Sequence, residues 1–180
     1  MPLLNSVTTP YAEALLQVVN ENDQTEEMVK EVKQLLSLIN DAPELEKTLS
    51  SPVLETETKK KIIIEIFSEK INPSLLNFLK LLADRQRIGI VTSILERFLE
   101  IYRENSNIAL ATVTSAVELT DDQKGLITKK IINIAGTEKL ELVTKIDPSL
   151  IGGFVASVGS KVIDASLASQ IRKLGLSLSK

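Results

Sequence analysis

Residues 146–174 have the sequence IDPSLIGGFVASVGSKVIDASLASQIRKL, which combines paired glycines, a Gly-Ser-Lys sequence and an Asp-x-Ser sequence in one short run. A phosphate-binding loop of the Walker A type requires G-x-x-x-x-G-K-[ST] leading into a helix. Here Gly153 and Gly159 are separated by five residues, and Ser160 precedes Lys161. The spacing therefore does not match a phosphate-binding loop, and the glycines must serve another geometry.

The same run has the pattern of a β-hairpin. Residues 154–158 and 161–164 are rich in β-branched residues and flank a Gly-Ser pair at Gly159, which predicts two strands joined by a two-residue turn. We expect Gly152 and Gly153 to supply special backbone angles or a close strand approach at the entry of this hairpin. All three glycines are therefore interpreted as structural turns.

The segment before the hairpin also combines strands with a helix. Residues 108–119, IALATVTSAVEL, are rich in β-branched residues and predict a strand. Thr120, followed by a glutamine three positions later, has the pattern of a capping box and predicts a helix that ends near Gly136. Residues 140–146 alternate in character, with the even-numbered side chains on the expected inner face, and predict a half-buried strand.

A last helix is expected after the hairpin, because Asp164 and Ser166 are both residue types that cap helix N-termini. The apolar residues that follow recur at helical spacing. They are Leu167, Ile171, Leu174 and Leu178. With this helix, residues 106–180 are expected to form a small α+β domain.

Residues 1–105 have a different pattern, because their apolar residues recur at helical spacing almost throughout. Prolines, a glycine and capping residues interrupt this periodicity at 20–23, 41–43, 50–52, 71–73 and 87–89. Six helices joined by short loops favour a compact six-helix bundle. Residues 1–105 carry a net charge of −5 and residues 106–180 a net charge of +2. We therefore expect two domains, an N-terminal all-α six-helix bundle at 1–105 and the α+β domain at 106–180.

The composition excludes most kinds of catalytic site. The chain contains no cysteine and no histidine, so it has no thiolate nucleophile, no disulfide and no side chain that is an ordinary general base near neutral pH. A carboxylate pair or a Ser-Lys dyad remains as an enzymatic alternative. We expect no catalytic, cofactor-binding or metal site and favour a binding or structural role.

The sequence contains no signal for membrane insertion or export and no pattern typical of nucleic-acid binding. No run of about 18 apolar residues is present, and the start MPLLNSVTTP lacks the features of a signal or transit peptide. The largest cationic cluster, at residues 59–61, has no interleaved aromatics and is expected to be a solvated helix face. We expect a soluble, unexported protein without a nucleic-acid partner.

The first and fifth expected helices have more apolar surface than one packing face needs. Projected at 100° per residue, the apolar arc of the first helix is about 200° wide, whereas a helix on one side of a small bundle needs about 100° or somewhat more. Either the surplus flanks form a groove for a partner, or both helices are central in the bundle. The residues on the surplus flanks are Tyr11, Ala14, Val18, Asn77, Phe78 and Leu81.

Three stretches together resemble one known family. These are IDPSLIGGF at 146–154, with the glycine, Val-Ile-Asp and serine that follow it, PYAEAL at 10–15 and NFLKLLADRQR at 77–87. In their residues, order and separations, these stretches resemble the characteristic stretches of the delta subunit of F-type ATP synthases. This subunit is called the oligomycin sensitivity conferring protein in mitochondria. The resemblance covers the whole chain. The stretch TSAVELTDDQ at 114–123 is similar to the cyanobacterial and plastid branch of this family.

The resemblance implies a non-catalytic clamp of the stator, without a cofactor. In this family an N-terminal six-helix bundle binds the N-terminal helix of an alpha subunit at the top of the catalytic head. The C-terminal domain holds the end of the peripheral stalk, which is built from b-type subunits. The resemblance thus implies a subunit peripheral to a thylakoid or bacterial inner membrane, on its stromal or cytoplasmic face, with membrane association only through the complex.

Two other functions stay open at this point. A helical adaptor or chaperone-like module that grips amphipathic helices would also have over-apolar helices. A phosphate- or nucleotide-binding α+β protein would use the loop at Gly152 and Gly153. A stator subunit is expected to sediment with a membrane-bound ATPase, whereas an adaptor is not.

We expect the isolated chain to bind no nucleotide and to hydrolyse no ATP, because the glycine spacing does not fit phosphates and the usual catalytic side chains are missing. Isothermal titration calorimetry with ATP and ADP at micromolar protein checks this. Saturable heat of binding would contradict the interpretation of the glycines as turns.

Overall fold

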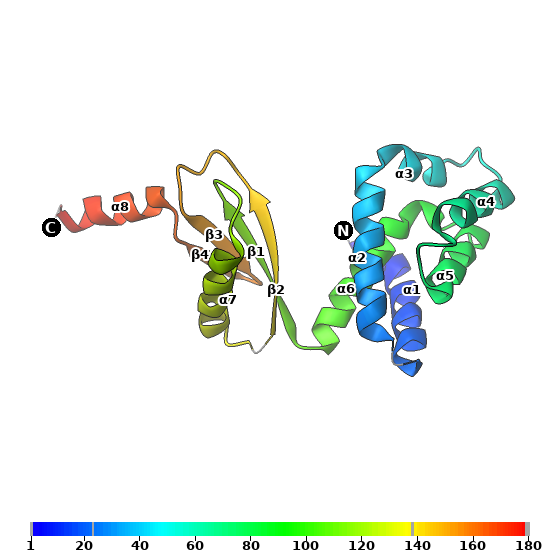
Figure 1. Cartoon of the computed structure of the whole chain (residues 1–180), viewed down its shortest axis with the longest axis horizontal. Helices are drawn as coiled ribbons and strands as arrows, with labels where there is room; N and C mark the ends of the chain where they lie inside the picture. Colours follow the sequence, from blue (N-terminus) through cyan, green and yellow to red (C-terminus); the bar gives the residue numbers. More distant parts are fainter. Residues whose placement is uncertain (1, 23, 138, 179–180) are drawn as a thin grey trace. The chain divides into compact units, whose positions relative to one another are not determined.

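The structure is a computed structural model that describes residues 2–22, 24–137 and 139–178, with side chains for 6–22, 24–134, 136–137 and 139–172. The chain divides into two compact units, Met1–Tyr102 and Arg103–Lys180 (Figure 1). The first unit is built from helices, and the second combines helices with a four-stranded sheet. The predicted mixture of an all-α region with an α+β region is therefore observed.

Helices account for the first unit, and most of their ends fall where the sequence predicted interruptions. The helices are α1 (Pro2–Glu21), α2 (Thr25–Asp41), α3 (Pro43–Ser50), α4 (Thr56–Phe67), α5 (Pro73–Asp84), the 3-10 helix η1 (Ile88–Ile90) and α6 (Val91–Asn105). Proline occupies the first turn of α3 and of α5, where its missing N–H has no helical partner. The Asn72 side chain caps α5 by accepting a hydrogen bond from the Ser74 N–H at 2.9 Å.

The expected interruption at 87–89 has a different form in the structure. Helix α5 ends at Asp84, and the residue with left-handed backbone angles is Gln86, with φ of 56°, rather than the nearby glycine. A short 3-10 turn then leads into α6. The sequence signal was the glycine, whereas the residue with left-handed backbone angles lies three positions before it.

One aliphatic core joins the helices of the first unit. Every helix from α1 to α6 contributes buried side chains to it, and Phe67 and Phe98 are its largest fully buried members. The cationic cluster at residues 59–61 lies on α4, where Lys60 contacts Asp84 and Glu57. These hydrogen bonds, the one to Asp84 first, raise the pKa of Lys60 above its ordinary value.

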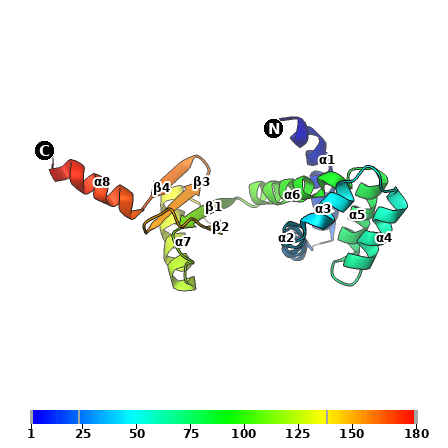
Figure 2. The ribbon, with the colours of Figure 1, turned by 90° about the horizontal axis from the view of Figure 1, so that it is seen from above.

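The second unit is a four-stranded sheet with one helix on one face (Figures 1 and 2). Its elements are β1 (Ile108–Ser115), α7 (Asp121–Ala135), β2 (Lys139–Ile146), β3 (Phe154–Val158), β4 (Lys161–Asp164) and α8 (Leu167–Leu178). The strand order is β2-β1-β3-β4, with β1 parallel to β2 and antiparallel to β3. Ile127 and Ile131 of α7 pack against Ala111, Val113 and Ala156 of the sheet.

Several local predictions for this unit are confirmed. Thr120 and Gln123 form the reciprocal hydrogen bonds of a capping box at the start of α7. The helix ends at Gly136, which has a left-handed φ of 72°. Strands β3 and β4 pair as a hairpin, and Gly159 takes a φ of 56° at the first position of its two-residue turn.

The predicted strand at 108–119 is too long. The sheet pairing ends at Ser115, whose hydroxyl donates a hydrogen bond of 2.7 Å to the carbonyl of Val117. That bond turns the chain away from the sheet, so β-branched composition alone overestimated the strand. The next four residues lead to α7 outside the sheet.

The prediction of a half-buried strand at 140–146 holds only for its first half. Leu140 and Leu142 are partly buried against the core, but Thr144 and Ile146, on the same expected inner face, are exposed. Strand β2 is an edge strand, and the buried side chains of α7 cover the middle of β1 and β3. The alternation of apolar and polar residues therefore predicted the strand correctly, but it did not predict how much of the strand is buried.

The paired glycines lie where two backbone segments approach closely. Gly153 has φ of 78°, and a Cβ on it would overlap the carbonyl of Ala165 and lie 2.9 Å from the Cα of Ser166. A Cβ on Gly152 would lie 2.7 Å from the Cδ1 of Leu167. The predicted roles of these glycines, special backbone angles and a close approach, are both observed.

The last helix begins at this contact. The hydroxyl of Ser166 accepts a hydrogen bond from the N–H of Ser169, and the carboxylate of Asp164 accepts one from the N–H of Ser166. Of the two candidate caps, Ser166 therefore caps α8, whereas Asp164 closes the turn before the helix. Leu167 and Ile171 are exposed, and the other two members of the predicted stripe, Leu174 and Leu178, lie outside the described side chains.

Replacement of Gly153 by alanine is expected to destabilise the second unit more than the same change at Gly136. Both residues have left-handed backbone angles, which cost an alanine about 1–2 kcal/mol. Only Gly153 also has backbone atoms in the way of a Cβ, which adds roughly 1–3 kcal/mol of overpacking. Native-state hydrogen exchange of the β3 and β4 amides measures the difference, and equal losses for the two variants would contradict the close approach.

Candidate partner-binding surfaces

Helix α1 buries one flank and exposes the other. Ala12, Leu15, Leu16 and Val19 are at most 5% exposed and belong to the core. On the neighbouring flank Tyr11 is half-buried, Ala14 is exposed and Val18 is 48% exposed. These three are the surplus apolar residues of the first predicted helix. The structure thus leaves an apolar stripe of α1 open, at the i, i+3 and i+7 spacing of one helix face.

Helix α5 repeats this arrangement. Its buried residues are Leu75, Leu79, Leu82 and Ala83. Phe78 is half-buried, Asn77 is exposed and Leu81 is 45% exposed. Leu81 thus adds an exposed apolar side chain beside the half-buried ring of Phe78.

The two exposed stripes border the same core. Tyr11 and Phe78 are both partly buried against the single cluster that fills the first unit. Chemically, the six candidate residues supply two aromatic rings, three aliphatic side chains and one amide, a composition suited to the apolar face of an amphipathic helix. Their role in binding a partner stays a prediction.

The described residues contain no group of three or more metal-binding side chains. Within that same part of the chain, no helix is long and apolar enough to cross a membrane.

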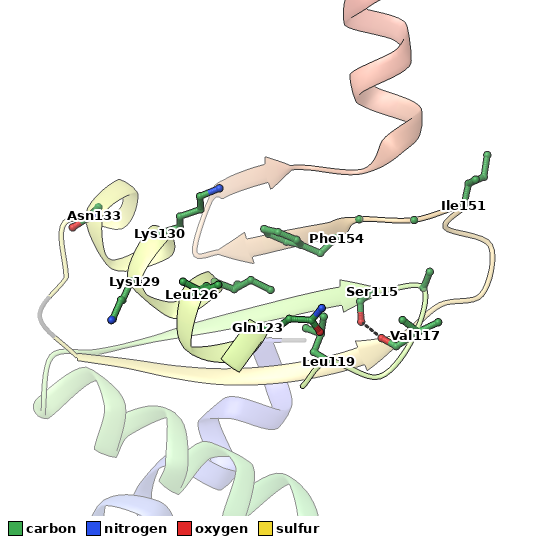
Figure 3. Close-up of a pocket in the computed structure, with 14 residues that line it drawn as sticks. Ser115, Val117, Leu119, Gln123, Leu126, Lys129, Lys130, Asn133, Ile151 and Phe154 are labelled. Atoms are coloured by element: carbon green, nitrogen blue, oxygen red, sulfur yellow. Dashed lines mark hydrogen bonds between the residues drawn. The ribbon is translucent and has the colours of Figure 1, made fainter. Parts of the chain in front are cut away.

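The second unit contains an apolar groove of about 830 Å³ that the sequence did not indicate. It lies between α7, the end of β1 with the residues that follow it, and the loop that contains the paired glycines; we call it the α7 groove (Figure 3). Leu126 of α7 and Phe154 of β3 lie on facing sides of it. Val117 and Ile151 also line it.

Much of this lining is exposed. Val117 is 69% exposed, Leu126 is 66% exposed and Ile151 is 80% exposed. Leu126 stands directly before Ile127, which belongs to the buried stripe, and the two side chains are about 100° apart around the helix. In the structure α7 buries Ile127 against the sheet and leaves Leu126 outside.

Local hydrogen bonds hold the loop that carries Ile151. The carboxylate of Asp147 accepts a hydrogen bond of 2.9 Å from the N–H of Ser149. Hydrogen bonds from the Ser149 side chain and backbone hold the pKa of Asp147 below its ordinary value. The N–H of Asp147 in turn donates to the carbonyl of Ser115, at the point where β1 ends. The loop that carries Ile151 is therefore held by its own carboxylate and tied to the end of β1 by a backbone hydrogen bond.

Comparison with known proteins decides the family. The family model for the ATP synthase delta (OSCP) subunit matches residues 7–178. The chain belongs to this family. It is 97% identical over 180 residues to the ATP synthase subunit delta of Prochlorococcus marinus subsp. pastoris (strain CCMP1986 / NIES-2087 / MED4), with 100% of both chains covered. It is 57% identical to the ATP synthase subunit delta of Prochlorococcus marinus (strain MIT 9303), with 100% of this chain and 99% of the relative covered.

A solved structure shows the same fold. A chain of the Toxoplasma gondii mitochondrial ATP synthase hexamer, determined by cryo-EM, matches this structure with a TM-score of 0.71 at 18% identity. The match covers 96% of this chain and 97% of the other. The resemblance drawn from three short stretches is thus confirmed, and the Prochlorococcus relatives fit its cyanobacterial side.

Proposed function

We infer that this chain is a non-catalytic stator subunit of an F-type ATP synthase, which links the catalytic head to the peripheral stalk and resists rotor torque during proton-driven ATP synthesis. The observation that carries this function is the family match over residues 7–178, together with full-length identity of 97% to an ATP synthase subunit delta. The absence of histidine and cysteine from the sequence agrees with a subunit that performs no chemistry.

The N-terminal domain, residues 1–105, acts in this proposal as a six-helix bundle that binds the N-terminal helix of an alpha subunit. The exposed apolar stripes on α1 and α5 support it, because a bundle helix in a well-packed core has no need of a second apolar flank. The binding residues are Tyr11, Ala14, Val18, Asn77, Phe78 and Leu81. The alternative that both helices are merely central does not account for their exposure.

The C-terminal domain, residues 106–180, binds the b-type subunits of the peripheral stalk in this proposal. Its exposed apolar side chains on α7, on the loop before β3 and on α8 support a protein partner. The chain reaches the membrane only through the assembled complex. A free adaptor or chaperone-like module would share these surfaces, but the family match favours the stator.

Tyr11→Ala and Ala14→Asp are expected to weaken binding of a synthetic alpha-subunit N-terminal peptide strongly. Loss of an aromatic anchor at the centre of a helix-in-groove interface costs about 2 kcal/mol, or roughly thirtyfold in affinity. Ala14→Asp instead places an unpaired charge in a contact that excludes water. Fluorescence anisotropy of the labelled peptide gives both affinities.

Stability distinguishes a binding surface from a core. Ala14 is exposed, so Ala14→Asp should leave the melting temperature nearly unchanged, and Tyr11→Ala should lower it only modestly because Tyr11 is half-buried. Asn20→Asp is the matched control, since it adds the same charge at an exposed position on another flank of α1. Wild-type affinity in both test variants would place the alpha-subunit contact elsewhere.

Deletion of residues 167–180 is expected to weaken binding to a soluble dimer of b-type subunits. The reason is that Leu167 and Ile171 are 43% and 64% exposed on α8 and offer an apolar stripe to a partner. Analytical ultracentrifugation of the truncated chain with the dimer measures the loss. Unchanged binding would exclude α8 and leave the stalk contact on the rest of the domain.

A further inference from the structure

Helix α5 carries three of the six candidate binding residues, and its own sequence cannot complete the cap at its N-terminus. In a capping box, the N-cap side chain accepts a hydrogen bond from the first turn, and a side chain three positions later accepts one from the N–H of the N-cap. Asn72 supplies the first half, because its side chain accepts a hydrogen bond from the N–H of Ser74. Three positions after Asn72 stands Leu75, which is apolar and fully buried, so α5 has no group for the second half.

Helix α2 supplies the missing group. The carboxylate of Glu31 accepts a hydrogen bond of 2.9 Å from the N–H of Asn72, although the two residues are 41 positions apart. Both residues are half-buried. Glu31 therefore completes from another helix the arrangement that a capping box makes within one helix. Its negative charge also lies at the end of α5 where the helix dipole favours an anion.

The other end of α5 is held by a cation. Lys60 of α4 forms a salt bridge with Asp84, the last residue of α5. Asp84 is 49% exposed, and a pair that reaches solvent to this degree contributes little to stability. A half-buried N–H that loses its partner costs more, because water does not fully replace the bond. Of the two attachments, the one made by Glu31 is therefore expected to matter more.

The residues Asn77, Phe78 and Leu81 lie between these two attachments on α5. A partner helix that contacts α1 and α5 together needs the two apolar stripes in a fixed relation to each other. A rotation or shift of α5 would move all three residues away from that relation at once. Preorganisation of α5 therefore has a direct effect on binding, since a surface that is already in place loses less entropy when the partner arrives.

We propose that Glu31 is a positioning residue for partner binding, which acts through the N-terminus of α5 and holds the stripe of α5 ready for the partner helix. The inference rests on the proposed function, because that function supplies the alpha-subunit helix as the partner. It goes further by assigning a role to a carboxylate on α2, outside the candidate binding residues.

Stopped-flow fluorescence of the full chain with a labelled alpha-subunit N-terminal peptide tests this role. If α5 is misplaced in part of the molecules, the observed association rate falls with the competent fraction, whereas dissociation of the formed complex is unaffected. Glu31→Ala should therefore slow association about fivefold or more and change the dissociation rate less than about twofold. Phe78→Ala should show the opposite pattern, because loss of a contact acts mainly on dissociation.

Three matched variants separate positioning from charge and from general stability. Glu31→Gln should recover most of the association rate, because its amide oxygen can accept the same hydrogen bond. Glu27→Ala removes the same charge from an exposed position one turn earlier on α2. Ile39→Val makes a small cavity in the core two turns later on α2 and lowers stability by an amount similar to the loss of a hydrogen bond. Both of these controls should associate within about twofold of wild type.

Hydrogen exchange without the peptide connects the kinetic effect to α5. The N–H of Leu76 donates to the carbonyl of Asn72 in the first turn of α5. Glu31→Ala should speed exchange at Leu76 more than Ile39→Val does, because only the first variant loosens this turn. Slowed association without faster exchange at Leu76 would overturn the inference, since the effect of Glu31 would then lie outside α5.

The outcomes also separate the inference from the function on which it rests. A wild-type association rate in Glu31→Ala, or equal slowing in Ile39→Val, would overturn the positioning role and leave the proposed function standing. Faster dissociation as the main effect of Glu31→Ala would likewise overturn it, because Glu31 would then act as a contact. Failure of the wild-type chain to bind the peptide would overturn the proposed function and the inference with it.

Discussion

A backbone contact without room for a side chain determines how the second unit is built. The segment at Gly152 and Gly153 lies against the segment at Ala165 and Ser166 so closely that a Cβ on Gly153 would overlap backbone atoms. From this point β3 departs in one direction and α8 in another, with the N–H of Leu167 donating to the carbonyl of Gly152. Gly152 and Gly153 themselves line the α7 groove, and so does Ile151 directly before them.

The local chemistry of the chain could be predicted from sequence because each signal depends on a few neighbouring residues. The capping box at Thr120, the left-handed end at Gly136 and the turn at Gly159 all follow from side-chain size and hydrogen-bonding groups within four positions. The surplus apolar arcs of α1 and α5 could be predicted for a related reason, since a helix has a fixed period. That period separates Ala12, which is buried, from Ala14, which is exposed.

What the sequence did not predict depends on contacts between distant segments. The exposure of Ile146 follows from how far α7 extends over the sheet, and the early end of β1 follows from a hydrogen bond made after the strand. The α7 groove has the same origin. Leu126 and Ile151 are 25 positions apart in the sequence, and nothing near either one shows that they line one surface. Hydrophobic periodicity describes the faces of one helix or strand at a time. The α7 groove, in contrast, forms only where three separate segments of the chain come together.

Two separate surfaces on two compact units give a stator a physical advantage that one larger surface lacks. When one unit is bound, the other is held near its partner, and a short linkage sets an effective concentration on the order of millimolar for the second contact. A contact that opens under torque is then remade before the subunit leaves. The two units also differ in net charge, −5 on residues 1–105 and +2 on residues 106–180, so their surfaces favour partners of different charge. In the proposed function, the division into two units therefore keeps the link between head and stalk closed and its two ends distinct.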